Sequence, residues 1–269
     1  MLPNALFLDV HMYGIMIAVG ILCCFGVLYL YGKKRGLDPG FLDFCFYDGI
    51  GAIAFGFFTA ALFQGIYNYI ENPENGFHLN GGITFLGGLI GGALFFIAAY
   101  LILRRKFKLK NTLADLTPVA ACCIAIAHAF GRMGCFFAGC CYGKETDGPL
   151  GMQFPGFSHK VYPTQLYEAV FLFIVFGIFS WFVWNKKAKN AFPAYLIVYG
   201  VWRFFLEFLR GDDRGKLFNV LSPSQFWSIV LVIVGILLIT VYPKIREKIL
   251  AKRAGDEGSK PDSETVQNN

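Results

Sequence analysis

"LADLTPVAACCIAIAHAFGRM", residues 113–133, is an apolar run long enough to cross a bilayer, and it ends beside an arginine. The hydrocarbon core of a membrane takes about 20 apolar residues in helical form. Six further runs of this kind occur, so the sequence predicts an all-α polytopic membrane protein with about seven transmembrane helices. The predicted spans are residues 11–31, 42–66, 83–103, 113–133, 165–184, 192–209 and 223–242.

The composition favours the same class of protein. The chain has 269 residues, of which 56% are hydrophobic and 16% are charged, whereas soluble domains contain about 25% charged residues. The net charge is +6, and the charged residues occur in short clusters between the apolar runs. Such clusters are typical of topology signals rather than of a nucleic-acid-binding face. We therefore expect the lipid bilayer as a partner and no nucleic acid.

The basic clusters also predict the orientation. They follow the first, third, fifth and seventh predicted spans, so all of them lie on one side of the membrane. The positive-inside rule then places the N-terminus outside and the C-terminus in the cytoplasm. We expect a transmembrane domain over residues 1–250 and a disordered cytoplasmic tail over residues 251–269, because this last segment is polar and lacks aromatic residues.

Ionisable residues inside spans cost about 3 kcal/mol or more each, so they are the best pointers to function. Arg132 ends the fourth span, and His128 lies one turn earlier on the same helix face. Arg203, Glu207 and Arg210 form an i, i+4, i+7 stripe on the sixth span. Two arginines beside one acid leave positive charge for an anion, and at this depth the available anion is a phospholipid headgroup. The alternatives are an interfacial anchor for Arg132 and a structural ion pair for Arg203 and Glu207.

Two other stretches are less specific. "GGLIGG", residues 87–92, predicts close helix packing, or alternatively bare backbone that lines a lipid pocket. "YPTQLYE", residues 162–168, opens the fifth span, and its one acid, Glu168, is expected in the first turn. An acid there is favourable for the helix dipole alone, so a capping role and a functional role both stay open.

Taken in order, these motifs resemble the prolipoprotein diacylglyceryl transferase family of bacterial membranes. The matching stretches are "YG" (13–14), "GGLIGG" (87–92), "GRMGCFFAGCCYG" (131–143), "YPTQLYE" (162–168) and "WRFFLEFLRGDD" (202–213). The resemblance implies transfer of the diacylglyceryl group of phosphatidylglycerol to the lipobox cysteine thiol of a prolipoprotein signal peptide. A thioether forms and glycerol phosphate leaves. It also implies the bacterial cytoplasmic membrane as the location, and we expect neither a cofactor nor a bound metal.

The resemblance assigns roles to individual positions. Arg132 and Arg203 match the essential arginines of the family and would bind the phosphate, while Glu207 matches an acidic partner that orients Arg203. The catalytic candidates are Arg132, Arg203, Glu207 and His128. The substrate-binding candidates are Tyr13, Gly87, Gly88, Gly143, Gln165, Tyr167 and Arg210.

The chain departs from the family signature G-R-x-x-N-F-x-N-x-E-x-x-G at three positions. Cys135, Ala138 and Cys140 stand where the two asparagines and the glutamate are expected, and Leu86 replaces the family's histidine. The general base therefore stays open between His128, the Arg203–Glu207 pair and a thiol. The departures also leave open a related lipid-headgroup transferase with a different acceptor, a non-catalytic phospholipid binder, or a thiol redox protein.

The thiols of Cys135, Cys140 and Cys141 have no single interpretation. Their C-x4-C-C spacing is not a recognised zinc pattern. Small-residue packing, a disulfide on the outer face and direct participation in the reaction all stay open, because Gly139 permits a tight turn between them.

Overall fold

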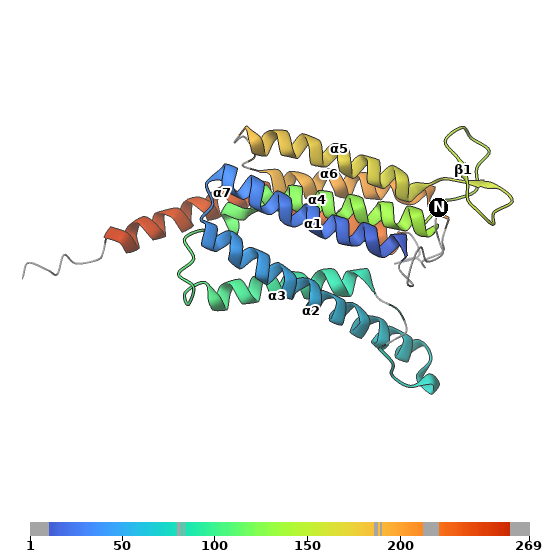
Figure 1. Ribbon diagram of the computed structural model, residues 1–269, viewed down its shortest axis with the longest axis horizontal. Coiled ribbons are helices and arrows are strands. Elements are labelled where there is room, and N and C mark those ends of the chain that lie inside the picture. Colours follow the sequence, from blue (N-terminus) through green and yellow to red (C-terminus); the bar gives the residue numbers. More distant parts are fainter. Residues whose placement is uncertain are drawn as a thin grey trace, which may run out of the picture. The chain divides into compact units, whose positions relative to one another are not determined.

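The computed structural model describes residues 11–79, 82, 84–185, 188, 190–211 and 221–258. The fold is helical, which confirms the predicted class (Figure 1). The α-helices are α1 (Met12–Arg35), α2 (Pro39–Glu71), α3 (Phe85–Leu103), α4 (Leu113–Ala138), α5 (Thr164–Trp184), α6 (Ala191–Leu206) and α7 (Pro223–Gly258). The short elements are the 3₁₀ turns η1 (Pro73–Asn75) and η2 (Glu207–Leu209) and the strands β1 (Met152–Gln153) and β2 (Lys160–Val161).

Within the described residues, six helices are long and apolar enough to cross a membrane. These are α1, α2, α4, α5, α6 and α7, and α3 is a shorter apolar helix. Each corresponds to one of the predicted spans. The count of seven spans and the orientation of the termini stay predictions.

Several helices extend beyond the predicted spans. The helix α2 continues to Glu71 rather than residue 66, and α7 continues to Gly258 rather than residue 242. Hydropathy marks only the apolar part of a helix, whereas backbone hydrogen bonding propagates into adjacent polar residues that are themselves good helix formers. The predicted tail therefore begins within α7, and residues 259–269 lie outside the described residues.

The chain divides into two compact units. The first unit comprises residues 1–24 and 117–269, and the second comprises residues 25–116. Each is described below by itself. The boundaries between these units fall within α1 and near the start of α4. The division predicted at residue 250 stays a prediction.

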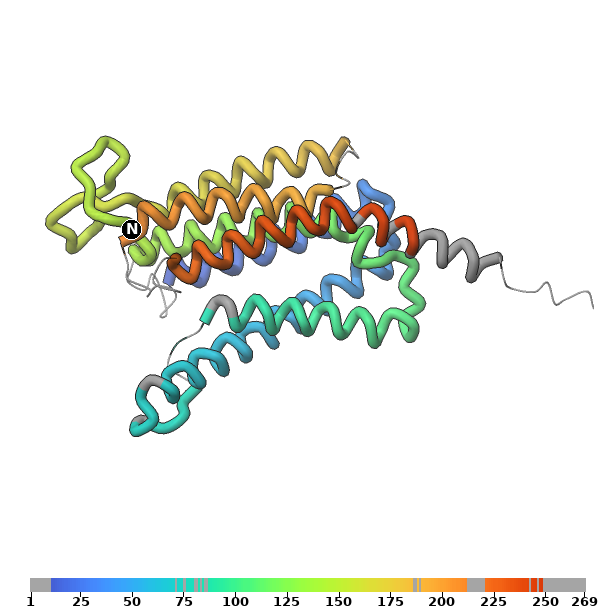
Figure 2. Tube along the Cα trace, turned by 180° about the vertical axis from the view of Figure 1, so that it is seen from behind, coloured from blue at the N-terminus to red at the C-terminus, as the bar shows by residue number. Residues whose placement is uncertain are grey.

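In the second unit, α3 packs closely along α2, as Figure 2 shows. A Cβ atom on Gly56 would lie 3.0 Å from the carbonyl oxygen of Gly88, and one on Gly92 would lie 3.0 Å from that of Ala52. The Thr59 hydroxyl also donates a hydrogen bond of 3.1 Å to the Gly87 carbonyl. The glycines therefore let two helix backbones approach, which is the close-packing interpretation of "GGLIGG".

In the first unit, small residues bring the start of α1 against α4 and bring α6 against α7. A Cβ atom on Gly20 would lie 3.1 Å from the Ala127 carbonyl oxygen, and one on Gly200 would lie 2.8 Å from that of Ser228. The buried face of α4 consists of small and branched residues, including Val119, Ala121, Cys122, Ala125 and Ala129. The helix α4 thus packs against the start of α1, and its polar residues meet those of α5 and α6.

The loop between α4 and α5 is held against the ends of both α5 and α6. Its strands β1 and β2 pair antiparallel, with Met152 opposite Val161. The Gly143 N–H donates to the Tyr162 carbonyl at 2.7 Å, and the Lys144 N–H donates to the Leu209 carbonyl at 2.8 Å. Three backbone segments thus converge at residue 143, where any side chain would collide with Thr164 and Tyr162.

The close approach of α2 and α3 predicts a large effect of Gly92→Leu on stability. Its side chain would force α3 away from the Ala52 carbonyl, and overpacking of this kind costs about 1–3 kcal/mol. We expect the thermal unfolding midpoint of the detergent-solubilised protein to fall by several degrees. Gly26→Leu is the matched control, because no described atom lies within 4 Å of a Cβ built there. Equal midpoints for the two variants would contradict the packing described for α3.

Candidate active site

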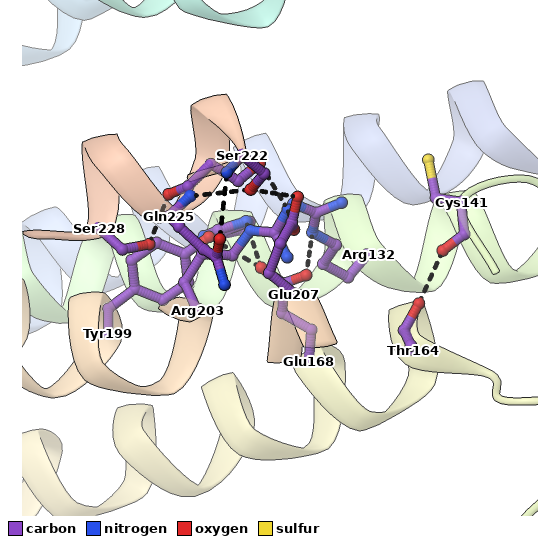
Figure 3. Close-up of polar contacts among 12 residues, drawn as sticks. Arg132, Cys141, Thr164, Glu168, Tyr199, Arg203, Glu207, Ser222, Gln225 and Ser228 are labelled. Atoms are coloured by element: carbon purple, nitrogen blue, oxygen red, sulfur yellow. Dashed lines mark hydrogen bonds and ion pairs between the residues drawn. The ribbon is translucent and has the colours of Figure 1, made fainter. Parts of the chain in front are cut away.

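A buried carboxylate, Glu168 on α5, lies at the centre of the polar cluster (Figure 3). Glu168 is 1% exposed to solvent. The Nε atom of Arg132 lies 2.9 Å from its Oε2 atom, and Nε2 of His128 lies 3.7 Å from Oε1. The Tyr199 hydroxyl on α6 donates a hydrogen bond of 2.8 Å to Oε1. Residues from α4 and α6 therefore meet on one carboxylate supplied by α5.

The helical geometry of α4 explains two of these contacts. Arg132 and His128 are four residues apart and share a helix face, as the sequence predicts. The His128 ring packs edge-on against the Tyr199 ring, with 5.0 Å between ring centroids. The imidazole is thus enclosed by a carboxylate, a guanidinium one turn away and an aromatic ring.

The interpretation of Glu168 as a helix N-terminal charge is wrong. The helix α5 begins at Thr164, so its first turn contains no acid and Glu168 lies in the second turn. Its carboxylate is occupied by side-chain partners instead. Burying a charged carboxylate in a membrane costs free energy unless the carboxylate is paired. The position of Glu168 inside a predicted span was therefore the feature of the sequence that could have indicated a partner.

A second ion pair lies at the end of α6. The Nη2 atom of Arg203 lies 2.7 Å from Oε2 of Glu207, and both side chains are 8% exposed. The Ser222 hydroxyl donates to Oε1 of Glu207 at 2.9 Å, and Nη2 of Arg203 donates to the Ser224 hydroxyl at 3.0 Å. The predicted i, i+4 contact is therefore present, and the start of α7 supports both of its members.

The start of α7 is itself a capping box. The Ser222 hydroxyl accepts a hydrogen bond of 3.2 Å from the Gln225 N–H, and the Gln225 side-chain oxygen accepts one of 3.1 Å from the Ser222 N–H. Pro223 occupies the first helical position, where its missing N–H costs nothing. This reciprocal bonding holds Ser222 where its hydroxyl can also reach Glu207.

The two arginines belong to one electrostatic cluster. Glu168 interacts with Arg132 and also with Arg203, and Figure 3 shows both arginine side chains reaching the same region from α4 and α6. Within the described part of the chain, Nη1 of Arg203 is buried without a hydrogen-bond partner, and so are both amide atoms of Gln165. A buried donor without an acceptor costs about 1–3 kcal/mol. These groups are therefore suited to a ligand that carries acceptor oxygens.

The predicted stripe of Arg203, Glu207 and Arg210 is wrong at its last member. The helix α6 ends at Leu206, and Arg210 follows η2 with extended backbone, φ −75° and ψ 145°. It is buried and forms a β-bridge with Gly143. Arg210 therefore does not place its positive charge beside Glu207 on the face of α6. The other arginine, Arg132, has its charge balanced by Glu168.

The remaining candidates lie in different surroundings. Tyr13 packs against Gly134 of α4 and interacts electrostatically with Arg132. Gln165 is buried in the first turn of α5, whereas the Tyr167 hydroxyl donates to the Leu150 carbonyl in the loop.

Three glycine candidates have packing roles in the structure. Gly143 permits the backbone convergence described above, and Gly87 and Gly88 belong to the second unit. Substrate binding by these glycines, and by Tyr13, Gln165, Tyr167 and Arg210, stays a prediction. The side chain of Leu86 lies outside the described part of the chain.

Comparison with known proteins identifies the family. The model of the family described as "prolipoprotein diacylglyceryl transferase" matches residues 3–241. A phosphatidylglycerol–prolipoprotein diacylglyceryl transferase of Clostridium tetani is 38% identical over 246 residues, which cover 87% of this chain and 94% of the relative. Enzymes of the same name from Clostridium perfringens and Francisella tularensis are 35% and 33% identical, covering 87% and 89% of this chain and 91% and 92% of the relatives.

The family match over residues 3–241 covers nearly the whole membrane part, and the residues of both ion pairs lie within that range. Together with the apolar helices, these matches identify a multi-pass membrane protein. The chain belongs to the prolipoprotein diacylglyceryl transferase family.

Proposed function

We propose that this protein transfers the diacylglyceryl group of phosphatidylglycerol to the lipobox cysteine of prolipoproteins, in the cytoplasmic membrane of a bacterium. Family membership supports the reaction class. The observation that carries the proposal is the buried cluster in which Arg132 and Arg203 each pair with a separate carboxylate, while Nη1 of Arg203 keeps an unpartnered donor among the described residues.

The reaction breaks one carbon–oxygen bond and forms one carbon–sulfur bond. The lipobox sulfur attacks the glyceryl carbon that carries the phosphate ester, and glycerol phosphate leaves with the electron pair of the broken bond. The thiol proton passes to a base. Charge therefore develops on the phosphate oxygens, where planar guanidinium groups donate most effectively. Such fixed donors act more strongly in a buried site than in water.

The two carboxylates act in this proposal as positioning residues. Glu168 holds Arg132 through its Nε atom, and Glu207 holds Arg203 through one terminal nitrogen. Each guanidinium thus keeps other donors for the phosphate. Fixing the donors before the substrate arrives removes the need to reorganise them during the reaction.

His128 is our candidate for the general base. Its Nε2 faces a carboxylate that is already fixed by Arg132 and Tyr199. A carboxylate beside an imidazole orients the ring and stabilises its protonated form, as in hydrolase triads. The contact of 3.7 Å is longer than a hydrogen bond, and catalytic contacts of this kind often shorten only when substrate is present.

Replacement of either arginine tests the phosphate role. We expect Arg203→Ala and Arg132→Ala each to reduce the rate of thioether formation by roughly two orders of magnitude, because a charged donor to a developing anion contributes about 3 kcal/mol or more. The assay uses purified protein, phosphatidylglycerol and a lipobox peptide, with lipoprotein maturation in a transferase-depleted strain as a second readout. Arg104→Ala is the control, since this arginine follows α3 in the second unit.

Two outcomes would count against the proposal. Near-normal rates in both arginine variants would remove the phosphate role. A wild-type protein that binds phosphatidylglycerol but forms no thioether would instead indicate a lipid binder or a transferase with another acceptor.

A double-variant cycle tests the positioning role of Glu168. Glu168→Gln keeps the shape of the side chain and an acceptor for Tyr199 but removes the charge that holds Arg132. We expect about a tenfold or greater loss in kcat, and we expect Arg132→Ala combined with Glu168→Gln to fall little further than Arg132→Ala alone. Independent, additive losses would show that Glu168 does not act through Arg132. Thermal unfolding of each variant separates this effect from loss of the fold.

A further inference from the structure

Three thiols gather where α4 ends. The Sγ atoms of Cys135, Cys140 and Cys141 all lie within 4.8 Å of one another, and each residue is half-buried. The mechanism proposed above uses none of them. Their C-x4-C-C spacing is not a recognised zinc pattern, and the local fold at the end of α4 brings them together.

The way in which α4 ends explains the pairing of Cys135 and Cys140. Gly139 has φ +69°, its N–H donates to the Phe136 carbonyl at 3.1 Å, and the Cys140 N–H donates to the Cys135 carbonyl at 3.1 Å. These two bonds define a Schellman motif, which regularly brings together the side chains at the two positions occupied here by Cys135 and Cys140. Thiols thus occupy the place of the usual hydrophobic contact.

Cys141 joins the pair through an uncommon backbone conformation. Its φ is +64°, in the left-handed region that residues other than glycine rarely adopt. Its carbonyl accepts a hydrogen bond of 2.8 Å from the Thr164 hydroxyl at the start of α5 (Figure 3). The strained conformation is therefore held in place by a second helix, and strain that is held in this way often marks a functional site.

Arginine side chains act electrostatically on one of the three thiols. The positive charges of Arg132 and Arg210 both act on Cys141. Thiolates are the ligands that zinc and other thiophilic metals prefer. A disulfide would use two of the three thiols and leave the third unexplained, whereas a metal ion uses all three.

We propose that Cys135, Cys140 and Cys141 form a three-thiolate site for a thiophilic divalent metal ion of the zinc class. Zinc–sulfur bonds of about 2.3 Å hold sulfurs a little under 4 Å apart in a tetrahedral centre, so the present cluster closes with small movements. Binding releases the thiol protons and leaves one coordination position for water. The metal would link the last turn of α4, which follows Arg132, to the loop that contacts α5. This proposal does not rest on the transferase reaction.

Metal titration of the full-length, fully reduced protein in detergent tests the site. Cd²⁺ is the probe, because its thiolate complexes absorb in the ultraviolet. We expect saturation at one Cd²⁺ per chain, and we expect Cys135→Ser, Cys140→Ser and Cys141→Ser each to weaken binding by about tenfold or more. Cys23→Ser is the control, since this half-buried thiol lies on α1 outside the cluster.

A protection experiment on the unaltered protein makes the test independent of how the variants fold. Zn²⁺ should slow alkylation of the three cluster thiols, mapped by mass spectrometry, and leave the rate at Cys23 unchanged. Binding that is not stoichiometric, or that persists in the Cys140→Ser/Cys141→Ser double variant, would overturn the proposal. A reducible disulfide within the cluster, with no metal bound by the reduced chain, would replace it with a redox pair.

Discussion

The buried charge of Glu168 determines how the first unit is arranged. A carboxylate removed from water is tolerated only where cationic and hydrogen-bonding groups surround it. No single helix supplies all of these partners: Arg132 and His128 come from α4, and Tyr199 comes from α6. The three helices must therefore pack in one register, and that register fixes the position of the Arg132 guanidinium. The proposed phosphate site is in this sense a consequence of supplying partners for the buried Glu168 carboxylate.

The second arginine is held by a different kind of constraint. Arg203 and Glu207 are four residues apart in the chain, so their pairing needs little more than a helical turn, and Ser222 and Ser224 at the start of α7 complete the arrangement. The cluster then contains two guanidinium groups and two carboxylates, and its charges balance when His128 is neutral. Anion binding would therefore depend on directed donors such as Nη1 of Arg203 rather than on excess positive charge. A balanced site also releases an anionic product more readily than a strongly cationic one.

Features that depend on periodicity within one helix were predictable from the sequence. The apolar runs predict the helices, and spacing of four residues predicts the shared faces of His128 with Arg132 and of Arg203 with Glu207. The role of Glu168 was missed because its partners lie on other helices. Arg210 was misplaced because the i+7 rule assumes that the helix continues, whereas α6 gives way to η2 and extended backbone. The contact between Cys135 and Cys140 could have been predicted from the sequence, because a glycine one position beyond α4 predicts a Schellman turn that joins these two residues.

The departures from the family signature fall in one place in the structure. Cys135 and Cys140 replace polar signature residues, and both belong to the turn that ends α4, as does Ala138. The two ion pairs involve none of these positions: Arg132 precedes the turn, and Glu168, Arg203 and Glu207 lie on other segments. A chain could therefore lose these signature side chains while keeping both arginines anchored by their carboxylates. On this argument the two anchored arginines of the proposed phosphate site follow the family pattern. The chain differs from the signature in the turn that follows Arg132, where Cys135 and Cys140 stand in place of an asparagine and a glutamate.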